Sequence, residues 1–226
     1  TGMTADDLSS VMQARPDGIL LPKVEDRNTV ITIADWMSAF DGDRPLTALL
    51  PIATENSRAV FRLDEIAKAH PRVGGIAYGV EDLAATMGLS RSRSESGHLL
   101  PVFQTVRHLA VIAAHAAGIA AIDTPHTMLD RFDLLEEEAR EAAVSGFTGK
   151  FALHPAQIST INEALRITPA IVAEAEEILS LYRNGGGAVF RYKGRMIDTP
   201  HIQAARPLLA RAASQGRAKT KQGDPA

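Results

Sequence analysis

The sequence predicts an α/β fold with a parallel sheet, and three observations lead to this prediction. Short apolar runs of strand length alternate with longer segments whose apolar residues recur at helical spacing, as in strands joined by crossover helices. Several of the short runs are apolar at nearly every position, which is typical of strands covered on both faces. The chain has 226 residues, 45% of them hydrophobic, and this length is compatible with one α/β barrel, for which about 250 residues is typical.

Five β/α units follow one another along the chain. Gly118 and Gly146 stand where two of the helices are expected to end, because glycine commonly follows the last helical turn. We expect strands over residues 18–24, 46–52, 73–78, 119–122 and 151–153. We expect helices over residues 27–40, 103–117, 134–145, 155–165 and 169–182, and a further one that includes Val60, Leu63 and Ile66.

The C-terminal part of the chain has a different pattern. Gly185 to Gly187 predict a loop, residues 188–192 and 194–197 predict a small hairpin, and residues 202–213 predict a last helix. From Gln215 onward the chain is rich in Gly, Lys and Gln and lacks large apolar side chains, so we expect a frayed tail.

Composition excludes several classes of function. The net charge of −3 gives no broad electrostatic attraction to nucleic acid or to an anionic membrane. Cysteine is absent, which excludes disulfides, thiolate metal sites and a cysteine nucleophile. No apolar run reaches the roughly 18 residues of a membrane span, and Thr1 to Asp7 do not resemble a secretory signal. We therefore expect a cytoplasmic protein without a nucleic-acid or membrane partner.

Charged and polar residues follow the predicted strands. Glu55, Asp82, Asp123 and His154 each come just after an apolar run, and the loops at the carboxyl ends of parallel strands converge on one opening. Two carboxylates from different strand ends, without cysteine, suit a hard cation such as Mg²⁺. Structural alternatives exist, since Asp82 could cap a helix that starts at Leu83 and Glu55 could stabilise a helix N-terminus.

Six short segments occur in an order that resembles one known family. They are L-P-K-V-E at 21–25, A-T-E at 53–55, Y-G-V-E-D-L at 78–83, A-I-D-T at 121–124, G-F-T-G-K-F-A-L-H-P-A-Q-I at 146–158 and G-R-M-I-D at 194–198. Each segment alone is a weak signal, but the whole set in this order is specific. On these segments the chain resembles the citrate lyase beta-subunit-like and malyl-CoA lyase-like family of the HpcH/HpaI aldolase superfamily.

The resemblance implies a fold and an activity. The fold would be a TIM (β/α)8 barrel that lacks its first three strands in this chain and carries a C-terminal helical and hairpin extension; a five-stranded open sheet is the alternative. We expect a barrel portion at 1–165, an extension at 166–213 that contributes to a neighbouring subunit's active site, and a disordered tail at 214–226. Family members are Mg²⁺-dependent lyases or synthases of 3-hydroxyacyl-CoA thioesters, such as malyl-CoA or citramalyl-CoA, that release acetyl-CoA and a 2-oxo acid.

The resemblance also implies which residues carry the chemistry. Glu55 and Asp82 would hold Mg²⁺, which polarises the carbonyl of the 2-oxo acid. Asp198 would act as the acid or base for the acetyl-CoA enolate from a neighbouring subunit, so we expect a homo-oligomer, a trimer or a hexamer. The alternative for Asp198 is a turn or cap before Thr199 and Pro200.

A second group would bind the CoA thioester. Lys150, Phe151, Ala152 and His154 would line the CoA side, Lys150 as a point charge for a phosphate, and Lys23 would face the same opening. As alternatives, Lys150 is a surface lysine and His154 fixes the turn before Pro155. We expect Asp123 to be a structural group rather than a metal ligand.

The sequence departs from the family pattern in two ways. Family members begin with about three more strands, which carry an acidic segment and an arginine that grips the substrate carboxylate, and neither segment is present here. Asn56 stands where a threonine or a similar small residue is usual. Two other functions therefore stay open: a CoA-independent metal-dependent aldolase of the same superfamily, and a non-catalytic subunit that binds CoA.

Overall fold

The computed structural model describes residues 4–40, 42, 45–184 and 189–222, and the chain divides into two compact units. Unit 1 comprises Thr1–Leu165 and unit 2 comprises Arg166–Ala226. Unit 1 combines parallel strands with helices, whereas unit 2 consists of two long helices and a hairpin. Among the described residues, no helix combines the length and the apolar character that crossing a membrane requires.

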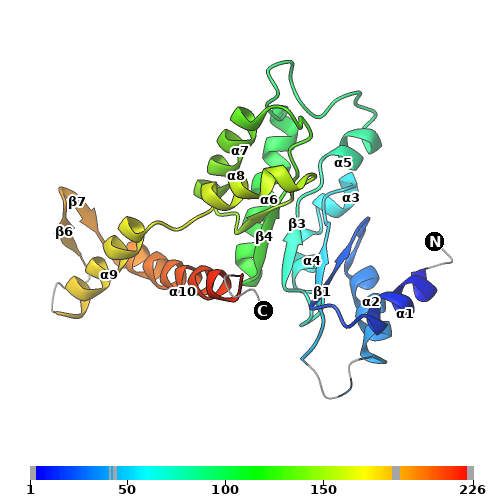
Figure 1. The fold of residues 1–226 in the computed structure, drawn as a ribbon, viewed down its shortest axis with the longest axis horizontal. Coiled ribbons are helices and arrows are strands. Elements are labelled where there is room, and N and C mark those ends of the chain that lie inside the picture. Colours follow the sequence, from blue (N-terminus) through cyan, green and yellow to red (C-terminus); the bar gives the residue numbers. More distant parts are fainter. Residues whose placement is uncertain (1–3, 41, 43–44, 185–188, 223–226) are drawn as a thin grey trace. The chain divides into compact units, whose positions relative to one another are not determined.

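In the part of unit 1 that the structure describes, five parallel strands follow one another in chain order (Figure 1). Isolated parallel bridges, Leu49 with Val73 and Ile52 with Ala77, join the second strand to the third. Because the strands run in one direction, their carboxyl ends share one edge. The strands are β1 (Gly18–Leu21), β2 (Ala48–Pro51), β3 (Gly75–Ala77), β4 (Ala120–Asp123) and β5 (Gly149–Lys150).

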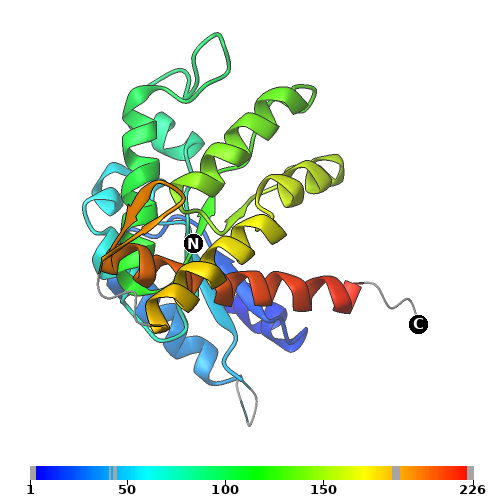
Figure 2. The ribbon, with the colours of Figure 1, turned by 90° about the vertical axis from the view of Figure 1, so that its left-hand side faces the viewer.

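Helices connect these strands, as crossover connections between parallel strands require. Figures 1 and 2 both show α7 and α8 side by side. Gly118 and Gly146 end α6 and α7 with left-handed φ angles of 70° and 101°, as the sequence predicts. The helical elements of unit 1 are α1 (Thr4–Gln13), α2 (Arg27–Ser38), α3 (Ser57–Val60), α4 (Leu63–Ala67), α5 (Glu81–Thr86), α6 (Pro101–Ala117), α7 (Phe132–Ser145), the 3-10 turn η1 (Pro155–Gln157) and α8 (Ile158–Ala164).

The core of unit 1 lies between the strands and these helices. All three residues of β3 are buried, which explains the continuous apolar run in the sequence. A Cβ added to Gly75 would lie 2.8 Å from Leu50 Cδ1 and 2.9 Å from the Ala120 carbonyl oxygen, so only glycine fits between β2 and β4 at this position. The predicted mixed α/β fold with parallel strands is confirmed.

Unit 2 packs around its own small core. Helix α9 (Pro169–Arg183) packs against α10 (Thr199–Gln222), and the antiparallel hairpin of β6 (Phe190–Tyr192) and β7 (Arg195–Ile197) joins the same core. Lys193 and Gly194, between the two strands, both have positive φ, the conformation that a tight hairpin turn requires. The buried apolar residues of this core are Ala175, Ile178, Leu179, Tyr192, Ile197, Ile202 and Ala205.

Two elements differ from the sequence prediction. The fifth strand is Gly149–Lys150 rather than 151–153, because Lys150 takes the register position opposite Asp123 and the chain then leaves the sheet. Helix α10 continues to Gln222, where a disordered tail from 214 was expected, since its Ala, Arg, Lys and Gln residues are good helix formers. The predicted loop at 185–187, residue 188 of the hairpin and the end of the tail at 223–226 lie outside the described residues.

Candidate active site

A cavity of about 330 Å³ opens at the carboxyl edge of the strands in unit 1. Leu20 of β1 and residues that follow each of the other four strands contribute to its wall, so the predicted convergence at the strand ends is present. The lining residues are Leu20, Ile52, Glu55, Tyr78, Gly79, Val80, Glu81, Asp82, Thr124, Pro125, Phe151, Ala152 and Leu153.

Glu55 is the acidic residue that the structure buries in this wall, with 8% of its surface exposed. The backbone N–H of Lys23, which follows β1, donates a hydrogen bond to Glu55 Oε2. Lys23 has a φ of 56°, a left-handed conformation that is uncommon for residues other than glycine. This unfavourable conformation, at the residue whose N–H contacts Glu55, is typical of a functional site.

Asp82 lies close to Glu55, although 27 residues separate them along the chain. The Lys23 ammonium lies 3.2 Å from Asp82 Oδ1, so one lysine contacts both carboxylates. Burial raises the pKa of Glu55, and a side-chain hydrogen bond with Asp82 and the charge of Asp82 raise it further, against the opposing hydrogen bond from Lys23. The structure thus brings together the two carboxylates that the sequence assigned to one metal ion.

The sequence reasoning missed how Thr54 fixes this arrangement. Its buried hydroxyl donates to the Gly79 carbonyl oxygen at 2.9 Å and accepts the Gly79 backbone N–H at 2.8 Å. These two bonds tie the residue before Glu55 to the start of the segment that leads to Asp82. A threonine directly before the strand-end glutamate was the available signal, but its partner is known only from the fold.

The structure tests the alternative that Asp82 caps a helix. Helix α5 begins at Glu81 with Val80 as its N-cap residue and has no side-chain cap bond, so Asp82 is not a cap. Asn56 is the N-cap of α3, where its side chain accepts the Ala59 N–H at 2.8 Å. The unusual residue at position 56 therefore has a local structural function, and the alternative that Asp82 caps a helix is wrong.

The donor set fits Mg²⁺. Carboxylate oxygens are hard ligands, and Mg²⁺ is commonly bound by one or two carboxylates together with waters and substrate oxygens. Among the described residues there is no group of three or more His, Cys, Asp or Glu that could hold a metal, so a cage made of protein ligands alone is not found there. The Lys23 ammonium contacts Asp82 as a cation would, which shows that this position accommodates positive charge.

A buried network of charged side chains contacts Thr124, one of the residues that line the cavity. Lys150 Nζ contacts Asp123 Oδ2 at 2.8 Å, Glu138 Oε1 at 2.7 Å and the Thr124 carbonyl oxygen at 2.6 Å. Arg107 forms a bidentate pair with Asp123, with distances of 2.9 and 3.0 Å. The network thus holds the chain just after β4, and Asp123 is a structural group as expected.

The Lys150 prediction requires a correction. Its side chain is fully buried and is engaged by two carboxylates and a carbonyl, so it is neither a surface lysine nor placed to meet a phosphate. The sequence could not show this because Asp123 and Glu138 reach Lys150 from other elements. Phe151 and Ala152 line the cavity as expected, whereas His154 is exposed and accepts the Ala156 N–H in the turn η1, outside the cavity wall.

Asp198 belongs to unit 2, between β7 and α10. Its carboxylate oxygen Oδ1 lies 2.6 Å from His201 Nδ1, and its backbone carbonyl accepts the Ile202 N–H. The sequence reasoning did not identify His201, although its position three residues after Asp198, at the start of a helix, allows this contact.

Comparison with known proteins relates the chain to one family. A family model described as HpcH/HpaI aldolase/citrate lyase matches residues 1–155. A citrate lyase subunit beta-like protein of Mycobacterium tuberculosis is 36% identical over 214 residues, which cover 93% of this chain and 73% of that protein. The mitochondrial citramalyl-CoA lyase of Mus musculus is 31% identical over 231 residues, which cover 95% of this chain and 66% of that protein.

A solved structure shows the same relationship. The protein CitE from Mycobacterium tuberculosis, in complex with magnesium, acetoacetate and coenzyme A, matches with a TM-score of 0.69 and 33% identity, over 87% of this chain and 68% of that chain. The family model covers well over half of the chain, and the two relatives, at 36% and 31% identity, each cover more than nine tenths of it. The chain belongs to the HpcH/HpaI aldolase/citrate lyase family.

Proposed function

We propose that this protein is a Mg²⁺-dependent carbon–carbon lyase, or synthase, of 3-hydroxyacyl-CoA thioesters such as malyl-CoA or citramalyl-CoA. The observation that carries the proposal is the meeting of Glu55 and Asp82, from two different strand ends, at the wall of one cavity. The names of the relatives support the substrate class, since one is a citramalyl-CoA lyase and another was crystallised with magnesium and coenzyme A.

Glu55 and Asp82 would hold the metal ion, which when bound supplies Lewis-acid polarisation of the 2-oxo acid's carbonyl. Thr54 keeps the two ligands at a fixed separation through its paired bonds with Gly79. The Lys23 ammonium lies beside Asp82 and would provide positive charge for the substrate carboxylate. These residues orient the oxo-acid half of the substrate.

The part of the wall that follows β4 and β5 would bind the thioester half of the substrate. Phe151, Ala152 and Leu153 follow β5 and line the cavity, and Thr124 and Pro125 follow β4. Largely apolar walls exclude water from the enolate of the released acyl-CoA, which protects it from premature protonation. Lys150 contacts the carbonyl of Thr124 in this wall, so its role would be positioning rather than phosphate binding.

Asp198 would be the acid and base for the α-carbon of the acyl-CoA. In cleavage the 3-hydroxyl loses its proton to solvent as it becomes the carbonyl of the 2-oxo acid. The carbon–carbon bond breaks, its electron pair stays on the α-carbon, and Asp198 gives that carbon a proton. We further propose that the parallel strands form part of a (β/α)8 barrel and that Asp198 acts from a neighbouring copy. This arrangement requires a homo-oligomer.

The proposal is tested by release of the 2-oxo acid from malyl-CoA and citramalyl-CoA. Cleavage is expected with Mg²⁺, absent with EDTA, and abolished in Glu55→Gln, whereas Glu65→Gln on the exposed face of α4 retains it. Activity that persists after removal of the metal would overturn the mechanism. Cleavage of a CoA-free hydroxy acid at the same rate would identify the CoA-independent aldolase, and CoA binding without turnover the non-catalytic subunit.

The shared site has its own test. Glu55→Gln and Asp198→Asn are each expected to be inactive, but co-expression of the two variants restores part of the activity if Glu55 and Asp198 of different copies form one site. If both residues of a site belong to the same chain, every site in the mixture lacks one of them. Absence of recovery in isolated mixed oligomers therefore contradicts action from a neighbouring copy.

A further inference from the structure

Asp198 and His201 form a side-chain pair at the start of α10 in unit 2. His201 Nδ1 lies 2.6 Å from Asp198 Oδ1, and 3.4 Å from the Asp198 backbone nitrogen. A nitrogen and a carboxylate oxygen at 2.6 Å must have a proton between them, because two lone pairs at this distance repel. The short contact, not the long one to the backbone, therefore determines how the ring is held.

Buried neighbours fix the backbone of both partners. Ile197 precedes Asp198 and is 1% exposed, and Ile202 follows His201 and is 4% exposed. Both isoleucines belong to the core of unit 2, and the Ile202 N–H donates to the Asp198 carbonyl oxygen. The core of unit 2 thus holds the backbone of the pair, while both side chains remain accessible, with 32% of the Asp198 side chain and 50% of the His201 side chain exposed.

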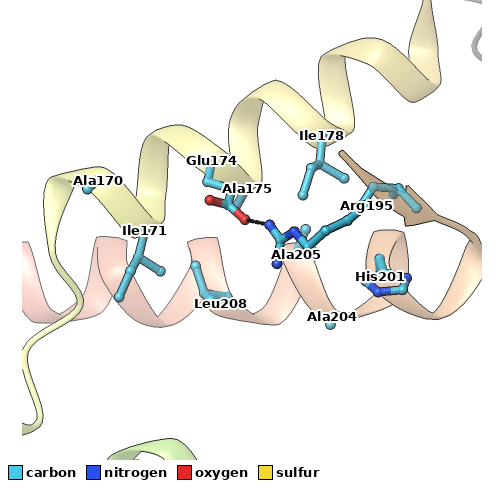
Figure 3. A pocket seen from close by; sticks show the side chains of 11 residues that line it. Ala170, Ile171, Glu174, Ala175, Ile178, Arg195, His201, Ala204, Ala205 and Leu208 are labelled. Atoms are coloured by element: carbon cyan, nitrogen blue, oxygen red, sulfur yellow. Dashed lines mark hydrogen bonds and ion pairs between the residues drawn. The ribbon is translucent and has the colours of Figure 1, made fainter. Parts of the chain in front are cut away.

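His201 is the polar side chain that contacts the Asp198 carboxylate. His201 lines a cavity of about 350 Å³ between α9, β7 and α10, and Figure 3 shows it at the end of that cavity where β7 lies. The other charged groups in this wall are Arg195 of β7 and Glu174 of α9, which pair with each other. Among the described residues, Asp198 Oδ2 has no hydrogen-bond partner, so one carboxylate oxygen is held and the other is free.

We propose that His201 is a positioning residue for proton transfer at Asp198: it holds Oδ1 so that Oδ2 is presented to the α-carbon of the acyl-CoA. This inference rests on the proposed function. In cleavage the proton on Oδ2 passes to the α-carbon, whose electron pair forms the new C–H bond, and Asp198 is left as the anion. Oδ1 keeps its hydrogen bond with His201 throughout, and solvent returns the proton to Oδ2 for the next turnover.

Three substitutions of His201 separate this role from a general structural one. The amide nitrogen of asparagine takes the place of Nδ1, and that of glutamine takes the place of Nε2, so only asparagine restores the donor to Oδ1. We expect His201→Ala and His201→Gln to lower kcat roughly tenfold to a hundredfold, the effect of misplacing a reacting group by about 1 Å, with KM changed less than about twofold. His201→Asn should retain activity within about threefold.

A partial reaction isolates the proton-transfer step. With Mg²⁺ and acetyl-CoA in D₂O, exchange of the methyl protons is followed by NMR, and it should slow in His201→Ala by the same factor as kcat. Gln203→Ala, an exposed position two residues further along α10, is the matched control and should behave like the wild type. Melting temperatures should be unchanged in all these variants, because the side chains are accessible.

The outcomes distinguish the inference from the proposed function. If Asp198→Asn retains full activity, the role of Asp198 itself fails. If Asp198→Asn is inactive while His201→Ala has the wild-type kcat and exchange rate, only the role of His201 is overturned. His201→Asn as slow as His201→Ala, or a loss in His201→Ala that appears in KM alone, would also overturn it.

Discussion

The Lys23 ammonium lies 3.2 Å from Asp82 Oδ1, and the Lys23 backbone N–H donates to Glu55. A single residue after β1 therefore contacts both proposed metal ligands, one through its side chain and one through its main chain. The two contacts have different consequences, because a substitution removes the ammonium and leaves the N–H.

Lys23→Met should strengthen Mg²⁺ binding. The ammonium competes with the metal for Asp82, and both side chains are exposed enough that such a pair contributes only about 0.2–1 kcal/mol, which corresponds to an up to roughly fivefold lower Kd. Isothermal titration of the protein with Mg²⁺ measures this. Lys23→Arg keeps the charge and should bind like the wild type. A higher Kd in Lys23→Met would show that the ammonium supports Mg²⁺ binding instead.

Glu55→Gln should stabilise the metal-free protein slightly. Burial raises the pKa of Glu55, with Asp82 adding to the effect, so the folded chain holds this proton more tightly than the unfolded chain. The corresponding stability is present at low pH and is lost as the pH rises through the raised pKa, which leaves a destabilising carboxylate at neutral pH.

This effect is measured by thermal melting at pH 7. In EDTA, Glu55→Gln should melt at or slightly above the wild-type temperature, and added Mg²⁺ should raise the melting temperature of the wild type but not of the variant. The exposed Glu65→Gln should respond to Mg²⁺ like the wild type. A variant that is still stabilised by Mg²⁺ contradicts the assignment of Glu55 as a ligand.

Gly79→Ala should disturb the site through steric contact. An added Cβ would lie 2.7 Å from Ile52 Cγ2 and 3.0 Å from Glu55 Cγ, so the glutamate must shift. We expect a loss of about 1–3 kcal/mol of unfolding free energy and weaker Mg²⁺ binding. Gly74→Ala is the control, since its Cβ meets only Ala48 Cβ at an ordinary 3.6 Å. Chemical denaturation and titration together test this, and equal behaviour of the two variants would contradict it.

Glu138→Gln should destabilise unit 1 in a pH-dependent way. Burial raises the pKa of Glu138, but the hydrogen bond from His126 and the charges of Lys150 and Arg93 outweigh it, so the pKa lies well below its ordinary value of 4.5. Removing this charge leaves buried cations with too few partners, which costs about 3–5 kcal/mol.

The pH window follows from the direction of this shift. A lowered pKa gives stability that is present above pH 4.5 and is lost as the pH falls below it, so wild type and variant should differ most at neutral pH and converge in acid. Denaturation between pH 3 and pH 8 measures this, with the adjacent exposed Glu137→Gln as control. A difference that does not change with pH would contradict the ionised state of Glu138.

The sequence by itself determined the order of the β/α units and the place of Glu55 and Asp82 after their strands. Strand and helix periodicity is local, and the same is true of the glycines that end α6 and α7, so these features can be recognised without knowing the fold. The order of short segments likewise indicated the family. The sequence placed the fifth strand two residues too late. Phe151 to Leu153 are apolar because they line the cavity, and they do not belong to the sheet.

Only the tertiary structure decided how these residues are used. Lys150 is buried by carboxylates that arrive 12 and 27 residues away in sequence, and Thr54 reaches Gly79 across 25 residues. Lys23 meets Glu55 and Asp82 only because three strand ends share one edge. The sequence specifies the charge and shape of each side chain. Its hydrogen-bond partners depend on which distant segments the fold places beside it.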